Sequence, residues 1–130
     1  MEKEIALALK IILQQFGPIR PEAWEKIIAT SKYIGLKKNQ NLPLQNGQCT
    51  YIIDGIFKEQ DSFQRQTPAI LNFYYSKQFI ITRKFQLANQ FISIQPCTLL
   101  FWEIDDLLSL YLEFKELGNV YNNLYAQCDY

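Results

Sequence analysis

The sequence predicts a mainly β domain, a β-sandwich or small jelly roll, with helices at both ends of the chain. Between positions 32 and 102, short runs rich in β-branched and aromatic residues alternate with close turn signals. At both ends, apolar residues instead recur every three or four positions, as in amphipathic helices. The chain has 130 residues, which fits a single domain. We expect N-terminal helices over 1–30, strands over 31–103 and C-terminal helices over 104–130.

The first thirty residues predict two helices. Gly17-Pro18 ends the first, and Pro21 stands in the first turn of a second that runs to Ala29. Proline suits that position because its missing N–H would be unpaired there. The apolar face of the first helix consists of Ile5, Leu9, Ile12, Leu13 and Phe16, and that of the second of Trp24, Ile27 and Ile28.

The middle of the chain predicts five strands joined by turns. Asn46-Gly47 and Asp54-Gly55 are turn or bulge dipeptides, and the polar segment 59–68 is expected to be a hairpin loop. The expected strands lie near Lys32–Lys37, Cys49–Lys58, Ala69–Tyr75, Gln90–Gln95 and Thr98–Trp102.

Helical spacing returns after Glu103. Asp105 is the expected N-cap, with Asp106 in the first turn, and this explains the acidic pair better than acid-base catalysis does. Gly118 is expected to break or bend the run. One apolar stripe before it consists of Leu107, Leu108, Tyr111 and Leu112, and a second consists of Leu117, Val120, Tyr121, Leu124 and Tyr125.

Composition excludes several classes of function. Thirteen basic and thirteen acidic residues cancel, so no general attraction to nucleic acid or to an anionic membrane is expected. Histidine is absent, which removes histidine-based catalysis and nearly every zinc hydrolase site, and no metal site is predicted. Cys49, Cys97 and Cys128 lie far apart; the first two are expected to be buried and the third free. With no convincing targeting or membrane-spanning segment, a soluble cytoplasmic protein with reduced thiols is expected.

Several strings, in this order, resemble the cyclic-nucleotide-binding domains of Crp/Fnr-type regulators. Two helices, a compact set of strands and two helices follow one another in both. Residues 51–58 resemble that family's glycine-containing hairpin, and 71–79 resemble the strand that enters its phosphate-binding cassette. The other matching strings are Pro21–Ile27, Lys37–Leu42, Phe91–Leu100 and the segments that begin at Asp105 and Phe114. The resemblance implies a double-stranded β-helix, also called a jelly-roll β-roll, and a role in signalling or transcription regulation.

The cassette departs from the family pattern. Lys77-Gln78 stands where the family has Gly-Glu, and Leu87-Ala88-Asn89 stands where it has Arg-Ser-Ala. A buried phosphate needs a fixed cationic donor, so no tight binding of cAMP or cGMP and no cofactor is expected. The cassette polar residues could instead form a site for a small anion, or simply a solvated loop; they are Lys77, Gln78, Arg83, Lys84 and Asn89.

The aromatic residues of this region have two interpretations. They could line a pocket that stacks a base, or they could fill the core, which strand alternation favours. They are Phe73, Tyr74, Tyr75, Phe79, Phe85 and Phe91.

The C-terminal stripe from Leu117 to Tyr125 could fold back on its own chain or pair with a second copy. The resemblance favours a homodimer built on these five residues, and no helix-turn-helix follows them, so this chain alone is not expected to bind DNA. The leading hypothesis is a non-enzymatic regulatory or sensor domain. The alternative is a ligand-free dimerisation or protein-interaction module of the same fold. A metal-dependent jelly-roll enzyme would need histidine ligands, which are absent.

Overall fold

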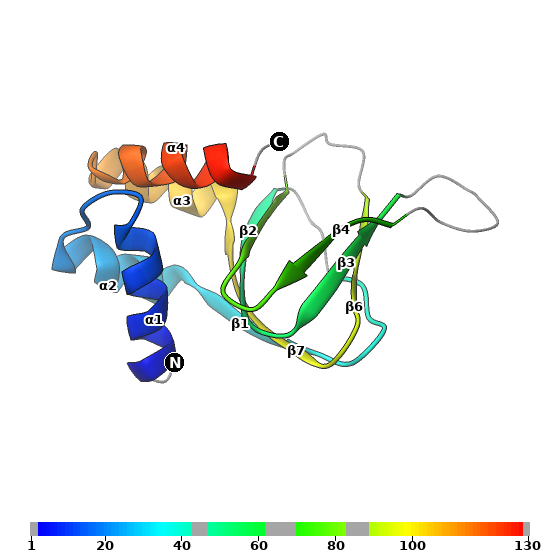
Figure 1. Cartoon of the computed structure of the whole chain (residues 1–130). Helices are drawn as coiled ribbons and strands as arrows, with labels where there is room; N and C mark the ends of the chain where they lie inside the picture. The colour runs from blue at the N-terminus through cyan, green and yellow to red at the C-terminus, as the bar shows by residue number, and fades with distance from the viewer. Residues whose placement is uncertain (1–2, 43–46, 62–69, 83–88, 129–130) are drawn as a thin grey trace. The chain divides into compact units, whose positions relative to one another are not determined.

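The computed structural model describes residues 3–42, 47–61, 70–82 and 89–128. The chain divides into two compact units. The helical unit comprises Met1–Ser31 and Trp102–Tyr130, and the β unit comprises Lys32–Phe101. In chain order the elements are α1 (Lys3–Gln14), α2 (Pro21–Thr30), β1 (Lys32–Leu36), β2 (Gln48–Asp54), β3 (Ile56–Gln60), β4 (Ile70–Tyr75), β5 (Phe79–Thr82), β6 (Gln90–Ser93), β7 (Cys97–Glu103), α3 (Ile104–Glu113) and α4 (Leu117–Cys128) (Figure 1).

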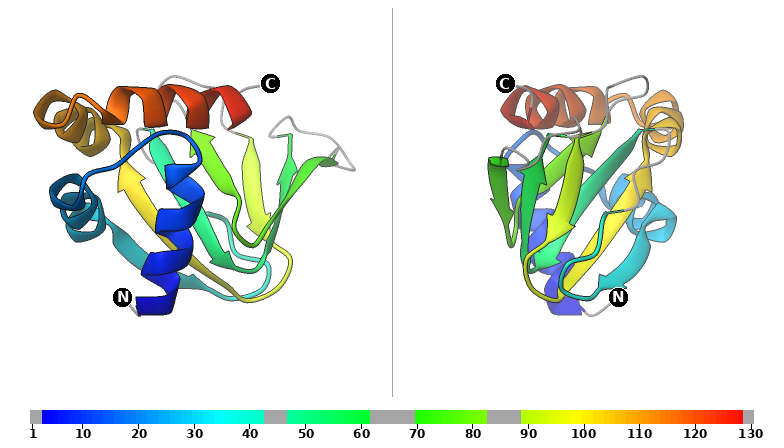
Figure 2. Two further views of the ribbon diagram at one scale, coloured as in Figure 1. Left: turned by 60° about the vertical axis from the view of Figure 1, so that its left-hand side comes forward. Right: turned by 90° about the vertical axis from the view of Figure 1, so that its right-hand side faces the viewer.

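The β unit consists of two sheets, which can be followed from two further directions in Figure 2. One has the strand order β1-β7-β2-β5 and the other β4-β3-β6. The pairs β1–β7, β2–β5, β3–β4 and β3–β6 are antiparallel. Together with helices at both ends of the chain, this confirms the predicted class, mainly β with flanking helices.

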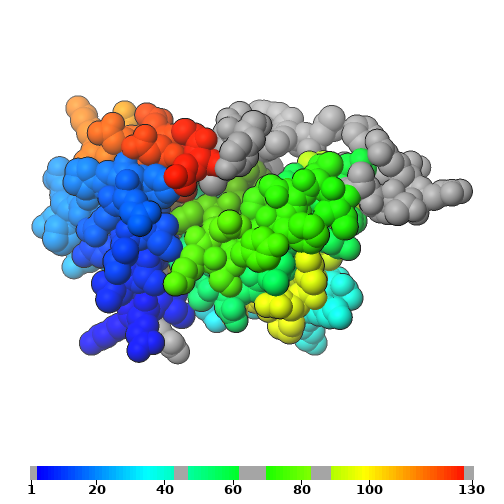
Figure 3. Space-filling model, viewed as in Figure 1, coloured from blue at the N-terminus to red at the C-terminus, as the bar shows by residue number. Residues whose placement is uncertain are grey.

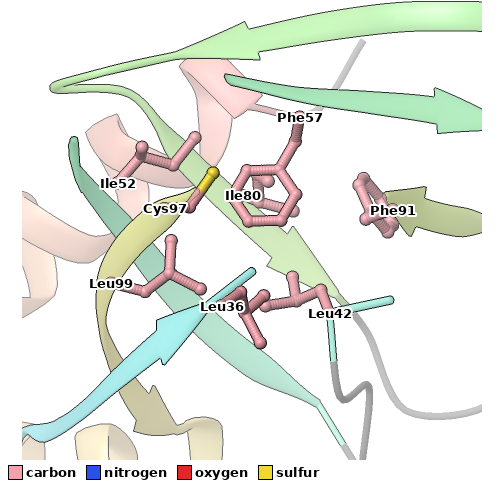
Figure 4. Packing of buried hydrophobic residues seen from close by; sticks show 8 residues of the cluster. All are labelled: Leu36, Leu42, Ile52, Phe57, Ile80, Phe91, Cys97 and Leu99. Atoms are coloured by element: carbon pink, nitrogen blue, oxygen red, sulfur yellow. The ribbon is translucent and has the colours of Figure 1, made fainter. Parts of the chain in front are cut away.

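Apolar side chains from both sheets meet in one core. Phe57 of β3 and Phe91 of β6 face residues of β2, β5 and β7, as Figure 4 shows. Alternate residues of each strand point to the same side, so each sheet supplies one apolar face. The buried cluster consists of Leu36, Leu42, Ile52, Phe57, Ile80, Phe91, Cys97 and Leu99.

Two strand predictions were wrong. The run Cys49–Lys58 is not one strand or a hairpin: it is β2 and β3, which meet at Gly55 and belong to different sheets. The strand β5 was missed, because four apolar or β-branched residues between polar neighbours were attributed to the cassette loop. The expected loop 59–68 lies largely outside the described residues, although Glu59 and Gln60 belong to β3. Asn46 also lies outside them.

The helical unit follows the sequence pattern with two corrections. Pro21 begins α2, as predicted. Asp105 is not the N-cap of α3: the helix begins at Ile104, Glu103 takes the cap position without a side-chain cap, and Asp105 falls in the first turn. The break before α4 lies at Phe114 to Glu116, and Gly118 is inside the new helix. An added Cβ at Gly118 would lie 2.5 Å from the ring of Tyr111, so glycine permits the close approach of that ring.

Long-range contacts hold the helices together. Helix α2 packs against α3, and α4 packs against both α1 and α3. The indole Nε1 of Trp102 donates to the Ile27 carbonyl at 2.8 Å, and the Asn123 side chain donates to the Phe16 carbonyl at 2.7 Å. These bonds connect the end of β7 and helix α4 to the N-terminal helices.

Candidate functional site

The turn between β4 and β5 carries Lys77 and Gln78, two of the residues expected in the degenerate cassette. The Lys77 N–H donates to the Ile52 carbonyl of β2 at 2.7 Å, and the Ile52 N–H donates to the Gln78 carbonyl at 3.0 Å. Lys77 has φ of 70°, in the left-handed region that favours glycine. The position where the family has glycine therefore keeps a glycine-like backbone, with an exposed lysine side chain.

The side chain of Gln78 has a structural role in this turn. Its Oε1 accepts a hydrogen bond from the Tyr75 N–H at 2.8 Å. Tyr75 ends β4, which is an edge strand of its sheet. Gln78 thus pairs a backbone N–H near a sheet edge. Unpaired N–H groups at such an edge can form hydrogen bonds with a strand of another chain. The side-chain Oε1 of Gln78 is used in the hydrogen bond to Tyr75, and a role of Gln78 in ligand binding stays a prediction.

A polar corner lies beside the turn. Ser76 Oγ accepts from the Gly55 N–H at 3.0 Å and lies 3.4 Å from Oδ1 of Asp54. Asp54, Ser76 and Lys77 are exposed. One carboxylate and one ammonium group at this corner do not give the positive surplus that a dedicated anion site requires.

Asn89 is placed elsewhere. Its side-chain NH₂ donates to Oε2 of Glu59 at 2.8 Å, and the Tyr74 hydroxyl donates to Oε1 of the same carboxylate at 2.9 Å. Glu59 pairs with Phe91 and lies two residues from the buried Phe57, so its side chain is on the core side of the sheet β4-β3-β6. The three polar groups form one cluster, which we call the Glu59 cluster (Glu59, Tyr74 and Asn89).

The structure does not bring the expected site residues together within the described ranges. Lys77 and Gln78 follow Tyr75, which pairs with Ile56 at the start of β3. Asn89 adjoins Gln90, which pairs with Gln60 at the end of the same strand. Arg83 and Lys84 lie outside the described residues. Sequence reasoning missed Glu59 because it was attributed to a loop; its two-residue spacing from Phe57 was the signal that placed it on the inner face.

The aromatic residues divide between the core and the surface. Phe79 and Phe91 are buried, and Tyr74 packs against the core with its ring 5.8 Å from that of Phe91. Phe73 and Tyr75 are exposed, so the core interpretation is wrong for these two. Both lie on the side of the edge strand β4 that faces away from Tyr74, and β4 (lime green) is open at the surface of the β unit in Figure 3. Phe85 lies outside the described residues.

The cysteines within the described part of the β unit are buried, as expected. Cys49 and Cys97 are buried cysteines. Burial raises the pKa of the Cys97 thiol, a backbone hydrogen bond with Ile56 lowers it in part, and the nearby Asp54 carboxylate raises it again. Cys97 is therefore held as a protonated, unreactive thiol. The side chain of Cys128 is not among the parts of the chain that the structure describes. Among the residues that the structure describes, no three His, Cys, Asp or Glu side chains gather as metal ligands would.

The stripe on α4 is covered by its own chain. The expectation of a dimer interface depended on this stripe lacking cover, and that premise is wrong. Helix α4 packs against α1 and α3, and Asn123 anchors it to the N-terminal segment. The buried members of the stripe are Leu117, Val120, Tyr121 and Leu124, while Tyr125 is half-buried with its ring 6.3 Å from that of Tyr121.

Within the described ranges, no helix is both long enough and apolar enough to span a membrane.

Comparison with known proteins shows similarity in fold and not in sequence. No protein-family model matches the chain, and no curated protein sequence matches it. Among solved structures, a cyclic-nucleotide-binding domain from Methylobacillus flagellatus superposes with a TM-score of 0.76 at 12% identity, over 96% of this chain and 76% of that one. The Thermus thermophilus catabolite activator protein gives a TM-score of 0.67 at 13% identity, over 89% of this chain and 55% of that one. The regulatory domain of Toxoplasma gondii PKA, crystallised with cAMP, gives a TM-score of 0.67 at 11% identity, over 85% of this chain and 46% of that one. The chain thus has the fold of cyclic-nucleotide-binding domains, which confirms the jelly-roll β-roll that the resemblance implied.

Proposed function

We propose that this chain is a non-enzymatic regulatory domain whose β-roll does not bind cAMP or cGMP tightly. Its fold is shared with a catabolite activator protein and with the regulatory domain of a PKA. Such a domain acts by shifting populations of states on binding, and makes or breaks no bonds. The absence of histidine from the sequence supports a non-enzymatic role.

The observation that carries this proposal is the Glu59 cluster. Asn89 stands at the end of the segment where the resembling family has Arg-Ser-Ala. In this chain its side chain donates to the carboxylate of Glu59 at 2.8 Å. Two unit negative charges 4 Å apart near a protein surface repel each other by about 4 kcal/mol. The carboxylate that accepts from Asn89 therefore disfavours an anionic ligand near this residue, where an arginine would favour it.

Titration calorimetry with cAMP and with cGMP tests the proposal. We expect no submicromolar binding of either nucleotide by the wild-type chain. In Glu59→Gln, the amide oxygen still accepts a hydrogen bond but the negative charge is gone, so weak nucleotide binding should strengthen at least about tenfold, and up to about a thousandfold for a phosphate within 4 Å. Glu113→Gln, which removes a carboxylate from the helical unit, is the matched control and should change nothing. Submicromolar binding by the wild type would overturn the proposal.

A second candidate, a ligand-free interaction module, is favoured by the filled core of the β unit. Phe57 is fully buried at its centre, and the surrounding cluster comes from both sheets (Figure 4). A ligand that binds only the folded state raises stability by about 2.7 kcal/mol at a hundred times its Kd. Thermal melts with cyclic nucleotides, inorganic phosphate and sulfate separate the candidates. A saturable rise in Tm supports a small anionic ligand and a sensor, and no rise supports the interaction module.

We also propose that this chain alone does not bind duplex DNA specifically. Its formal charge of zero gives no phosphate-driven affinity. A mobility-shift titration at low salt should show no saturation at low micromolar protein, and a salt-dependent shift would contradict this. The free, buried thiol of Cys97 supports a reducing compartment such as the cytoplasm.

A further inference from the structure

Strand β4 has the composition of a segment that pairs readily with other strands. Its six residues are apolar or aromatic except for Asn72, and none of them is charged, proline or glycine. Exposed runs of this kind, with high β-propensity and no charge, are the ones that stack into cross-β assemblies. β4 is also an edge strand of its sheet. Four of its residues are between 41% and 53% exposed: Ile70, Leu71, Phe73 and Tyr75.

The backbone polar groups of Phe73 and Tyr75 point to the open edge of β4. The Ile94 N–H, just after β6, donates to the Ile56 carbonyl at 2.9 Å, so the polar groups of Ile56 face β6. Those of Lys58, two residues further along β3, face the same way, because the direction alternates along a strand. Ile56 pairs with Tyr75, and Lys58 pairs with Phe73. These two residues of β4 therefore turn their N–H groups away from β3.

Side chains of the same chain pair both of these N–H groups. Asn72 Oδ1 accepts from the Phe73 N–H at 2.8 Å. Gln78 Oε1 accepts from the Tyr75 N–H at 2.8 Å, and the Gln78 N–H donates to the Tyr75 carbonyl at 3.1 Å. Two residues of antiparallel strands exchange a pair of bonds of this kind. Gln78 thus makes the two bonds at Tyr75 that a partner strand would make, and Asn72 makes one of them at Phe73.

We propose that Asn72 and Gln78 are edge-protecting residues, which keep β4 from pairing with a strand of another molecule. An incoming strand has to break their hydrogen bonds before it forms its own, so it gains little at these positions. Edge strands are commonly protected by a charge or a proline, and β4 contains neither. The protection therefore falls on the two amide side chains. It requires no ligand, so it holds or fails independently of the function proposed for the β-roll.

Amide exchange of the full chain, followed by NMR, tests the two hydrogen bonds separately. After correction for intrinsic rates, Asn72→Ala should speed exchange of the Phe73 amide at least about threefold and leave the Tyr75 amide unchanged. Gln78→Ala should do the reverse. Circular dichroism should show both variants folded, since both substituted side chains are exposed. Exchange that is unchanged at either amide would overturn the proposal.

Light scattering and thioflavin fluorescence over a concentration series test the consequence for assembly. The double variant, Asn72→Ala with Gln78→Ala, should form β assemblies at a concentration at least about tenfold lower than the wild type, because two edge N–H groups are then unpaired. Gln40→Ala is the matched control for Gln78→Ala. It removes a bond of the same kind, from the Lys37 N–H to Gln40 Oε1 at 2.8 Å, away from β4. It should behave like the wild type.

A third substitution identifies β4 as the strand that assembles. Leu71→Lys, added to the double variant, introduces a charge into the segment and should return the assembly concentration to that of the wild type, since charged edges resist pairing. A double variant that assembles no more readily than the wild type would overturn the proposal. So would a Gln40→Ala control that assembles as readily as Gln78→Ala, because assembly would then follow any lost hydrogen bond.

Discussion

Gly55 and Cys97 lie so close together that no side chain fits at position 55. A Cβ added to Gly55 would lie 2.7 Å from the Cβ and 2.9 Å from the Cα of Cys97. Gly55 also has φ of 132°, a conformation that other residues rarely adopt. At this point the chain passes from β2 in one sheet to β3 in the other, directly against the start of β7. The path between the two sheets therefore depends on a glycine.

Gly55→Ala should destabilise the chain by about 2–4 kcal/mol, because a methyl group meets backbone and an unfavourable φ. Urea denaturation measures this. Gly35→Ala is the control, since an added Cβ there meets nothing within 4 Å. Its stability should match that of the wild type or exceed it by up to about 1 kcal/mol. Equal midpoints for the two variants would contradict the close contact.

Lys77→Gly should stabilise the chain by about 0.5–1 kcal/mol. The left-handed backbone at Lys77 costs a non-glycine residue about 1–2 kcal/mol, which outweighs the entropic cost of glycine in the unfolded state. Lys38→Gly is the comparison, because Lys38 does not have a positive φ, and it should be neutral or destabilising. If both glycine variants lose stability equally in thermal melts, the left-handed turn at Lys77 is refuted.

Gln78→Ala should cost about 0.5–1.5 kcal/mol through loss of the hydrogen bond to the Tyr75 N–H. Gln78→Glu keeps a carbonyl oxygen in reach and should retain most of that stability. The free energy of unfolding of the two variants distinguishes a structural role from a ligand-binding one. An alanine variant as stable as the wild type would show that the bond contributes nothing.

Trp102→Phe should cost about 1–3 kcal/mol. The substitution leaves the Ile27 carbonyl without its buried indole donor and removes part of a fully packed ring system. Trp24→Phe is the matched control in the same unit, because Trp24 is only half-buried. Chemical denaturation should rank Trp102→Phe well below Trp24→Phe, and the reverse order would contradict this contact.

Alkaline pH should destabilise the fold. Burial raises the pKa of Tyr51 above 10.0 and that of Cys97 above 9.0. Between the unfolded and folded pKa values, the unfolded state has lost a proton that the folded state retains, so stability falls as pH rises. We expect constant stability from these groups below about pH 8 and a decline above it. Tyr51→Phe should make the decline shallower, and an unchanged slope would refute the contribution of Tyr51.

The local sequence pattern was sufficient to predict those helices and strands whose turn, cap and spacing signals lie within a few residues of one another. Helical spacing and Pro21 predicted α2 almost to its ends, and the β-branched runs predicted β1, β4 and β7 closely. The order of the elements then led to the correct fold by resemblance. Local pattern failed at β5, whose four residues are too few to separate a strand from an apolar loop. It failed again at Gly55, because a turn dipeptide does not reveal that the strands on either side join different sheets.

The sequence by itself determined the fold class, the lack of histidine chemistry, the balance of charge and the departures from the cassette pattern. Only the tertiary structure decided which apolar faces are covered, because burial depends on contacts between distant residues. In the folded chain the stripe on α4 is buried and Leu112 on α3 is exposed, although apolar residues recur with the same helical spacing in both helices. It also joined Glu59 to Asn89, thirty residues apart, through strand pairing that no local signal specifies.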